Sequence, residues 1–243
     1  MLGTDNEQQE VDNMKFKHFF QRKENKYLFS KDQFDCFLSD LLQYMQVDQY
    51  GLHTIRSLYY DTSDNQFILS SMEKPEYKEK FRVRSYGNPM GESFIFLEIK
   101  KKSEGIVYKR RLSMTYSEYL EWESSKIFPE ALMQKQVAKE IAWLFRKYPN
   151  LSPKVLISYD RLSLFYEEDD NFRVTFDQNI RYQSQEAKLC SALGPLVAPD
   201  LDVLMEVKAV GAYPIWFVEL LSRHQRYKGN FSKYAQTYQR HLI

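Results

Sequence analysis

Charged side chains recur at every second position in segments that otherwise have the composition of β-strands. Lys80, Arg82 and Arg84, for example, alternate with Phe81 and Val83. Successive side chains of a strand point to opposite faces, so residues two apart share a face. The same spacing groups further residues: Glu24 and Lys26; Glu98 and Lys100; Lys109 and Arg111; Tyr159 and Arg161; Arg173, Thr175 and Asp177; Glu206 and Lys208. The pattern predicts a sheet with one apolar face and one charged face.

Turn residues and apolar spacing predict antiparallel strands with helices between some of them. We expect strands at Lys17–Tyr27, His53–Thr62, Tyr77–Tyr86, Ser93–Lys101, Ile106–Met114, Lys154–Tyr166, Asn171–Tyr182 and Asp202–Ala209. Helices are expected after the N-cap Ser30 and at Asp64–Met72, Ser117–Trp122, Lys135–Tyr148, Ile215–Leu221 and Ser232–Leu242. Together these elements predict an α+β fold: an antiparallel closed β-barrel with helices packed at its margins.

The charged face has two interpretations: it faces solvent, or it lines the lumen of a barrel. The whole chain is nearly neutral, with 34 Lys and Arg against 33 Asp and Glu, yet the charged faces are mostly Lys and Arg. Cations that share a lumen repel one another, which favours a ligand of high negative charge density. Phosphate chains suit such a lumen, because Arg grips phosphate oxygens in pairs and Lys acts as a point charge. The glutamates Glu24, Glu98 and Glu206 are suited to hold Mn²⁺ or Mg²⁺, which prefer oxygen ligands.

Composition excludes several other classes of protein. A formal net charge of +1 argues against a nucleic-acid binder. Two cysteines, Cys36 and Cys190, predict reduced thiols rather than a disulfide framework. No apolar run approaches the ~20 residues needed for a transmembrane helix, and Met1–Asn13 lacks the features of a signal peptide. We therefore expect a cytoplasmic protein with a polar tail at residues 1–13 and a single domain at 14–243.

Eight short motifs, in order along the chain, resemble the triphosphate tunnel metalloenzymes, and in particular the polyphosphate-polymerase domain of the vacuolar transporter chaperone (VTC) family. The motifs are Arg22–Tyr27, Ile55–Thr62, Phe81–Gly87, Phe96–Lys100, Tyr159–Arg161, Arg173–Asp177, Met205–Lys208 and Ser232–Tyr234. The resemblance extends from about Phe16 to Tyr238. It implies a tunnel that binds a nucleoside triphosphate and a growing polyphosphate chain. Neither the sensor domain nor the membrane region of the eukaryotic members fits in this chain, so a stand-alone form is expected.

The resemblance also assigns roles to residues. Phosphate-binding positions are matched by Lys26, Arg82, Arg84, Lys100, Lys109, Tyr159, Arg161, Arg173 and Lys233, and Glu206 matches the metal-binding glutamate. Arg56, Lys80, Arg111, Lys208 and Ser232 are added as phosphate-binding candidates, and Glu24 and Glu98 as further metal ligands. The catalytic set is predicted to be Arg82, Arg84, Lys100, Arg161 and Glu206.

The expected activity is metal-dependent transfer of the γ-phosphate of ATP to polyphosphate or inorganic phosphate, with release of ADP. Two alternatives use the same residues. Water in place of the acceptor would make the chain a tripolyphosphatase or nucleoside triphosphatase, and binding without turnover would make it a polyphosphate-binding module. The sequence contains no Gly-rich P-loop motif and no nucleophile elbow. ATP and polyphosphate or phosphate are thus the expected partners; no protein partner is predicted.

Overall fold

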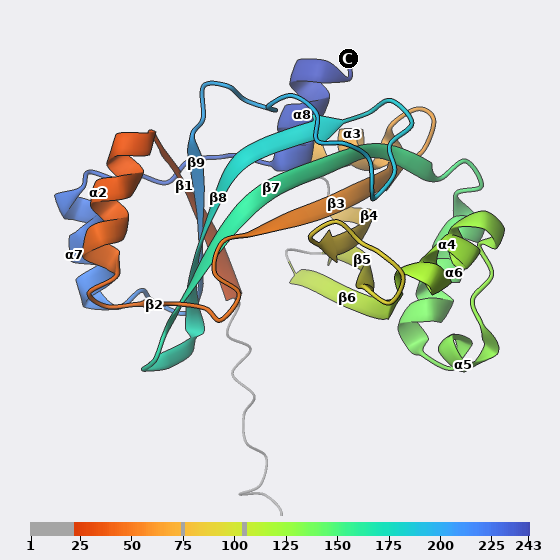
Figure 1. The fold of residues 1–243 in the computed structure, drawn as a ribbon, viewed down its shortest axis with the longest axis horizontal. Coiled ribbons are helices and arrows are strands. Elements are labelled where there is room, and N and C mark those ends of the chain that lie inside the picture. The colour runs from red at the N-terminus through yellow and green to blue at the C-terminus, as the bar shows by residue number, and fades with distance from the viewer. Residues whose placement is uncertain (1–21, 74–75, 104–105) are drawn as a thin grey trace, which may run out of the picture.

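The computed structural model describes residues 22–73, 76–103 and 106–243. A nine-stranded antiparallel sheet forms its centre, in the order β1-β9-β8-β7-β3-β4-β5-β6, with the short β2 paired to β7 (Figure 1). The strands are β1 (Arg22–Phe29), β2 (Gln46–Val47), β3 (His53–Asp61), β4 (Tyr77–Tyr86), β5 (Phe94–Ser103), β6 (Ile106–Thr115), β7 (Ser152–Tyr166), β8 (Asp169–Gln183) and β9 (Val203–Val210). The predicted antiparallel strands are confirmed within the described residues, whereas residues 17–21 and the tail at 1–13 lie outside them.

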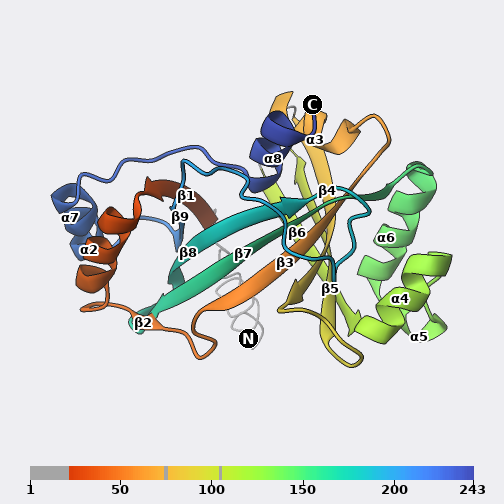
Figure 2. The same cartoon turned by 45° about the horizontal axis from the view of Figure 1, so that its top comes forward.

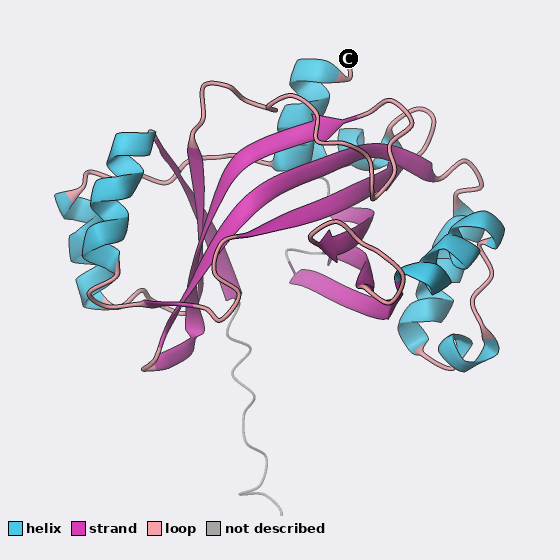
Figure 3. Cartoon of the chain, viewed as in Figure 1, coloured by secondary structure: helices cyan, strands magenta, loops and turns pink. Residues whose placement is uncertain are grey.

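The helices lie at the margins of the sheet, as Figure 3 shows. They are α2 (Lys31–Leu41), α3 (Gln66–Glu73), α4 (Tyr116–Ser125), α5 (Glu130–Met133), α6 (Gln136–Lys147), α7 (Ile215–Arg223) and α8 (Lys233–His241). Ser30 caps α2 as predicted: its hydroxyl accepts a hydrogen bond from the Gln33 amide, and the Gln33 side chain accepts one from the Ser30 amide. This reciprocal pair satisfies two backbone donors that a helix start leaves free.

Two apolar clusters cover one face of the sheet, which we call the outer face. On one side α2 and α7 pack against β1, β8 and β9, with Phe37 and Phe217 meeting Phe176 and Val207. On the other side α4 and α6 pack against β3 to β6, where Trp122 is a fully buried anchor. Figure 2 shows these two helical groups at opposite ends of the sheet. The alternation of the strands therefore directs the charged side chains to the opposite face, the inner face.

A third apolar cluster covers part of the inner face. Tyr234 and Tyr238 of α8 pack with Tyr59, Val155 and other inner-face residues of β3 and β7. The Tyr59 and Tyr234 rings are stacked, with centroids 4.7 Å apart. The Tyr234 hydroxyl donates to the buried carboxylate of Asp61, at 2.8 Å. These contacts dock α8 on the inner face and place its first residue, Lys233, among the charged side chains.

Hydrogen bonds do not close the sheet into a barrel within the described residues. The two outermost strands, β1 and β6, are not paired with each other. The free edge of β1 instead receives a single bridge from Gly229, whose amide donates to the Lys26 carbonyl at 2.8 Å. The predicted sheet and its helices are thus present, whereas the predicted closure is not seen. Among the helices described, none combines the length and the apolar character required to cross a membrane.

Candidate functional site

The strand registers bring the charged inner-face residues into rows that run across the sheet. Arg82 of β4 lies opposite Glu98 of β5, and Glu98 opposite Arg111 of β6. On the other side of the sheet, Lys26 of β1 lies opposite Glu206 of β9. Two clusters result. The Glu98 cluster consists of Arg82, Arg84, Glu98, Lys109 and Arg111, and the Glu206 cluster of Lys26, Arg161, Asp177, Glu206 and Lys233.

Cations surround one buried carboxylate in the Glu98 cluster. Arg82 donates to Glu98 Oε2 at 2.8 Å, Arg111 donates to Oε1 at 2.6 and 2.9 Å, and Lys109 Nζ lies 3.1 Å from Oε1. Burial alone would raise the pKa of Glu98, but the charges of Arg82, Arg84 and Lys109 outweigh it and hold this pKa well below its usual range. The carboxylate is therefore ionised, and one negative charge stands against four cations.

A row of lysines lies beside the Glu98 cluster. Lys80, Lys100 and Lys109 are directly opposite one another on β4, β5 and β6. Like charges in such cross-strand pairs destabilise a sheet. In the part of the chain that the structure describes, the Lys80 and Lys100 side chains have no carboxylate partner. Burial lowers the pKa of Lys80 to about 8, and neighbouring cations such as Lys100 add to this effect. The row is thus suited to a polyanionic ligand.

The Glu206 cluster contains two carboxylates. Arg161 donates to Asp177 at 2.6 and 2.7 Å and to Glu206 Oε2 at 3.1 Å. Lys233 Nζ lies 2.5 Å from Asp177 Oδ2 and 3.1 Å from Glu206 Oε1. Burial opposes ionisation of both acids, but Lys233 and Arg161 overcome it and lower the pKa of each below its usual value. Lys26 completes the cluster, with Nζ 3.5 Å from Glu206 and 2.7 Å from the Phe231 carbonyl.

Tyr159 connects the two clusters. Its hydroxyl accepts a hydrogen bond from Arg84 at 3.2 Å. Its ring faces two cations of the other cluster, with Lys233 Nζ 4.5 Å and Arg161 Cζ 5.1 Å from the ring centroid. Because cations favour the electron-rich face of an aromatic ring, these contacts bind the clusters into one basic surface. That surface reaches from β1 to β6.

Most of the residues predicted to bind phosphate lie on this surface. Beyond the two clusters and the lysine row, Arg173 and Lys208 are opposite each other on β8 and β9, and Lys208 lies opposite Glu24 of β1. The register also resolves the facing of β6: Lys109 and Arg111 point to the inner face, whereas Arg110 pairs with Glu140 of α6 on the outer face. A run of three basic residues thus divides between two faces.

Two of the predicted phosphate-binding residues have contacts of a different kind. Arg56 belongs to the outer face, opposite Ser85 and Ser158, and donates to the carbonyls of Leu189 and Ser191. Its prediction as a tunnel residue is wrong, because its position in β3 has the opposite parity to Ser57 and Tyr59. The Ser232 hydroxyl caps α8 by accepting from the Ala235 amide. That bond gives Ser232 a helix-capping role, one residue before Lys233.

The three predicted metal ligands do not form a joint site. Glu98 and Glu206 lie in different clusters, and the contacts of Glu24 among the described residues are long, at 3.9 Å to Lys26 and to Lys208. The described residues contain no group of three or more His, Cys, Asp or Glu side chains arranged to hold a metal ion. Glu206 and Asp177 share Lys233 and lie together in the basic surface. A pair of carboxylates fits Mg²⁺ or Mn²⁺ that also takes ligands from a substrate phosphate.

Two residues of the site were not assigned a role from the sequence. Asp177 is fully buried and holds both Arg161 and Lys233. The sequence does place Asp177 on the same strand face as Arg173 and Thr175, which could have identified it as a residue of the site. Tyr59 accepts a hydrogen bond from Arg82 at 2.9 Å. Burial raises the pKa of Tyr59, but Arg82, Arg84 and Lys80 outweigh burial and lower it to about 8.

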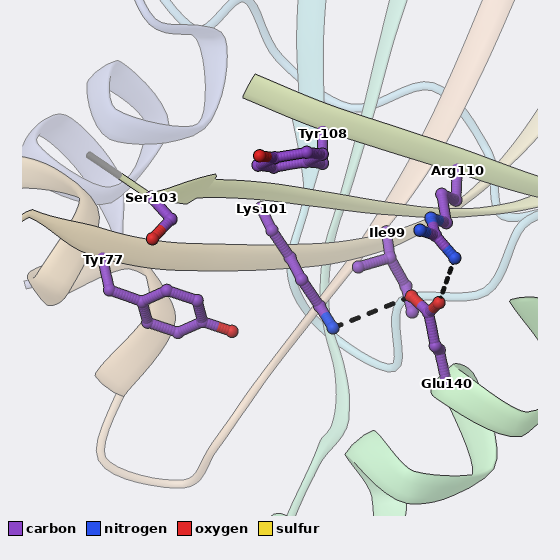
Figure 4. A pocket seen from close by; sticks show the side chains of 7 residues that line it. All are labelled: Tyr77, Ile99, Lys101, Ser103, Tyr108, Arg110 and Glu140. Carbon is purple, nitrogen blue, oxygen red and sulfur yellow. Dashed lines mark hydrogen bonds and ion pairs between the residues drawn. The ribbon is translucent and has the colours of Figure 1, made fainter. Parts of the chain in front are cut away.

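The outer face of β4 to β6 carries a separate pocket of about 290 Å³ (Figure 4). Lys101 and Arg110 both pair with Glu140 there, and Tyr77 and Tyr108 lie nearby. Alternation separates this pocket from the basic surface, because Lys101 and Arg110 alternate with Lys100 and Lys109. These outer-face residues therefore provide matched controls for substitutions on the inner face.

Comparison with known proteins agrees with this architecture. A candidate adenylate cyclase from Bacillus halodurans has a similar structure, with a TM-score of 0.56 and 18% identity over 91% of this chain and 99% of its own. A candidate adenylyl cyclase from Hippeastrum with a dominant triphosphatase activity is similar at a TM-score of 0.51 and 14% identity, covering 89% of this chain and 94% of its own. No curated protein sequence gives a significant match. The VTC domain family, in contrast, matches residues 21–242, so this chain belongs to the VTC domain family.

Proposed function

We propose that this protein is a metal-dependent polyphosphate polymerase, which transfers the γ-phosphate of ATP to a growing polyphosphate chain and releases ADP. The main support is the excess of inner-face cations over carboxylates, in two clusters that Tyr159 joins and that extend from Lys26 on β1 to Lys109 on β6. Neighbouring strands are about 4.8 Å apart, so this surface offers contacts to more phosphates than one triphosphate contains. Membership of the VTC domain family supports the same activity.

Phosphoryl transfer depends mainly on positioning and on charge stabilisation. In the proposed reaction the bond between the γ-phosphorus and the β–γ bridging oxygen breaks, and ADP leaves with the electron pair. The γ-phosphorus then bonds to a terminal oxygen of the acceptor, which is already anionic, so no general base is needed. Arg82, Arg84 and Lys100 would hold one side of the transferring group and Arg161 the other, with Tyr159 between them.

Glu206 and Asp177 are the residues proposed to hold a divalent metal ion, together with phosphates of the nucleotide. Mg²⁺ in proteins is commonly held by one or two carboxylates together with substrate phosphates. Glu206, with Asp177 beside it, would supply the protein ligand, and Mn²⁺ has the same oxygen preference. When bound, the ion would neutralise charge on the phosphate oxygens. Glu98 is the one carboxylate of its cluster and is surrounded by Arg82, Arg111 and Lys109, so its proposed role is to fix these cations.

A triphosphatase is the second candidate, because the Hippeastrum protein of the same fold has a dominant triphosphatase activity. Water would replace the polyphosphate acceptor on the same surface. Incubation of the protein with ATP and Mn²⁺ or Mg²⁺, with and without a short polyphosphate primer, separates the two. ADP released in step with growing polymer supports the polymerase. Inorganic phosphate without polymer identifies a hydrolase, and tight binding without turnover identifies a binding module.

Lys100→Ala and Lys101→Ala form a matched pair for this assay. Both side chains belong to β5, but Lys100 faces the lysine row and Lys101 faces Glu140 on the outer face. Loss of a group that stabilises developing charge costs about 100-fold in kcat. We expect a loss of that order in Lys100→Ala and Glu206→Gln, and an unchanged rate in Lys101→Ala. Equal rates in the two lysine variants would contradict the placement of the reaction on the inner face.

A further inference from the structure

Aromatic side chains gather on the inner face where β3 begins and β4 ends. The Tyr86 ring lies 5.9 Å from the His53 ring and 5.6 Å from the Phe96 ring, measured between centroids. We call His53, Tyr86 and Phe96 the aromatic end. All three belong to the inner face, because His53 lies opposite Arg161, Tyr86 opposite Ile55, and Phe96 opposite Arg84.

These rings differ in exposure from the aromatic residues that pack under the helices. Tyr86 is 47% exposed, whereas Phe81 of the same strand, on the outer face, is 0% exposed. Phe94, two residues before Phe96 and on the same face, is also exposed. Each exposed ring leaves apolar area in water that a ligand could cover. Core packing therefore does not account for Tyr86, the exposed member of the aromatic end, beside which His53 and Phe96 are half-buried.

The aromatic end is continuous with the Glu98 cluster. The Arg111 guanidinium lies over the Phe96 ring, with Cζ 4.5 Å from the centroid, while Arg111 also binds Glu98. Tyr86, Arg84 and Arg82 are alternate residues of one strand, so their side chains follow one another along the inner face in steps of roughly 7 Å. A ligand lying along β4 would meet an aromatic ring first and two guanidinium groups next.

From this order we infer that the aromatic end binds the base of a nucleoside triphosphate whose phosphates lie on the Glu98 cluster. This inference rests on the proposed function and adds to it the site that distinguishes a nucleotide from a bare phosphate chain. An aromatic base joined to a polyanion has the same two parts, in the same order, as the protein surface. Stacking accepts any base, because every base presents a π-face. The site thus selects nucleoside triphosphate over inorganic tripolyphosphate, with little preference among bases.

Binding measured without turnover tests this inference. Calorimetry would compare a β,γ-imido analogue of ATP with inorganic tripolyphosphate, in the same metal-containing buffer, for the wild type and Tyr86→Ala. One base–aromatic stack corresponds to roughly 5- to 100-fold in affinity. We expect Tyr86→Ala to lower the affinity for the analogue by about 10-fold, at the low end of that range. The affinity for tripolyphosphate should fall by less than about twofold.

Two further variants control the test. Tyr86→Phe keeps the ring, and we expect it to bind the analogue as the wild type does. Tyr108→Ala removes a tyrosine of matched exposure, 49%, from the outer face of β6. It should leave the affinity for both ligands unchanged. A thermal melt of each variant checks that it is folded.

The outcomes separate this inference from the proposed function. If the wild type fails to bind tripolyphosphate, the basic surface does not take phosphate chains, and both proposals fail. If tripolyphosphate binds but Tyr86→Ala lowers the affinity for both ligands equally, the inference alone is overturned. The same holds if the variant changes neither affinity. It is also overturned if Tyr86→Phe binds the analogue as weakly as Tyr86→Ala, because the Tyr86 hydroxyl, which is hydrogen-bonded with Arg111, would then be responsible rather than the ring.

Discussion

Lys80 and Lys109 illustrate how the setting of a single residue changes its chemistry. Burial lowers the pKa of both to about 8, from 10.5, and only partial compensation comes from Tyr59 near Lys80 and from Glu98 near Lys109. A lowered lysine pKa means that the folded protein holds these protons less tightly than the unfolded chain does. Between about pH 8 and 10.5 the empty protein therefore becomes more stable as pH rises. Below pH 8 both lysines are charged; Lys80 has no carboxylate partner among the described residues, whereas Lys109 is paired with Glu98.

Phosphate binding should have the opposite pH dependence. Above pH 8 a bound polyanion must first restore the missing protons, so the affinity for tripolyphosphate should fall by up to about tenfold per pH unit for each lysine. Titrations between pH 7 and 10 would measure this slope. Lys80→Gln should bind more weakly at pH 7 and show a shallower slope. Ionisation of the ligand itself affects the wild type and the variant equally, so it cancels when their slopes are compared. Identical slopes would exclude Lys80 from the binding surface.

At the scale of elements, α8 carries more of the site than its nine residues suggest. It places Lys233 between Asp177 and Glu206, and it is fixed by the bond from Tyr234 to Asp61. The Asp61 carboxylate also accepts from the amides at the start of α3, including those of Phe67 and Ile68. One buried carboxylate therefore joins β3, α3 and α8.

Tyr234→Phe should loosen this junction without removing the ring. The variant leaves Asp61 with one donor fewer, which costs about 1–2 kcal/mol of unfolding free energy. Lys233 should then be held less firmly, so we also expect weaker tripolyphosphate binding. Tyr238→Phe is the control, because Tyr238 lies one turn further on, and within the described residues its hydroxyl has no hydrogen-bond partner. Urea denaturation and calorimetry would measure the two effects, and equal behaviour of the variants would contradict this role of Tyr234.

Element-scale reasoning also explains what the sequence could predict. Alternation predicted the inner face of β4 to β6 and of β9 correctly, because burial on the outer face fixes the register of each strand. The addition of Arg56 as a phosphate-binding candidate did not rest on alternation, and this outer-face arginine instead donates to carbonyls of the 184–199 segment. The approach of Asp177 to Lys233 was beyond prediction, because it depends on how α8 docks across 55 residues of intervening chain. Closure of the barrel by hydrogen bonds, which is not seen among the described residues, is hard to predict for the same reason: edge pairing is a long-range property.

At the scale of the whole molecule, the charges are segregated rather than abundant. A net charge of +1 is combined with an inner face on which cations dominate. This distribution attracts a flexible polyanion that can reach the inner face, but gives little attraction to a large polyanion held outside it.

Competition with duplex DNA would test this distinction. Tripolyphosphate binding should weaken steeply as salt rises from 50 to 500 mM, since ions screen the surface. An equal concentration of phosphate supplied as duplex DNA should not displace it, because a rigid duplex cannot lie along the inner face beside α8. Displacement by DNA would mean that the accessible cations lie on the outside of the molecule.

The opposed lysines of β4, β5 and β6 have a consequence for the lifetime of the protein. Without a polyanion, Lys80, Lys100 and Lys109 repel one another across adjacent strands. A polyanion that binds only the folded chain removes this repulsion. It adds about 1.4 kcal/mol to the free energy of unfolding for each tenfold excess of its concentration over its Kd. Proteolysis of the transiently opened chain would slow in the same proportion. In a cell whose phosphate reserves run down, this protein would be degraded faster, so its abundance would follow the supply of the polymer it is proposed to make.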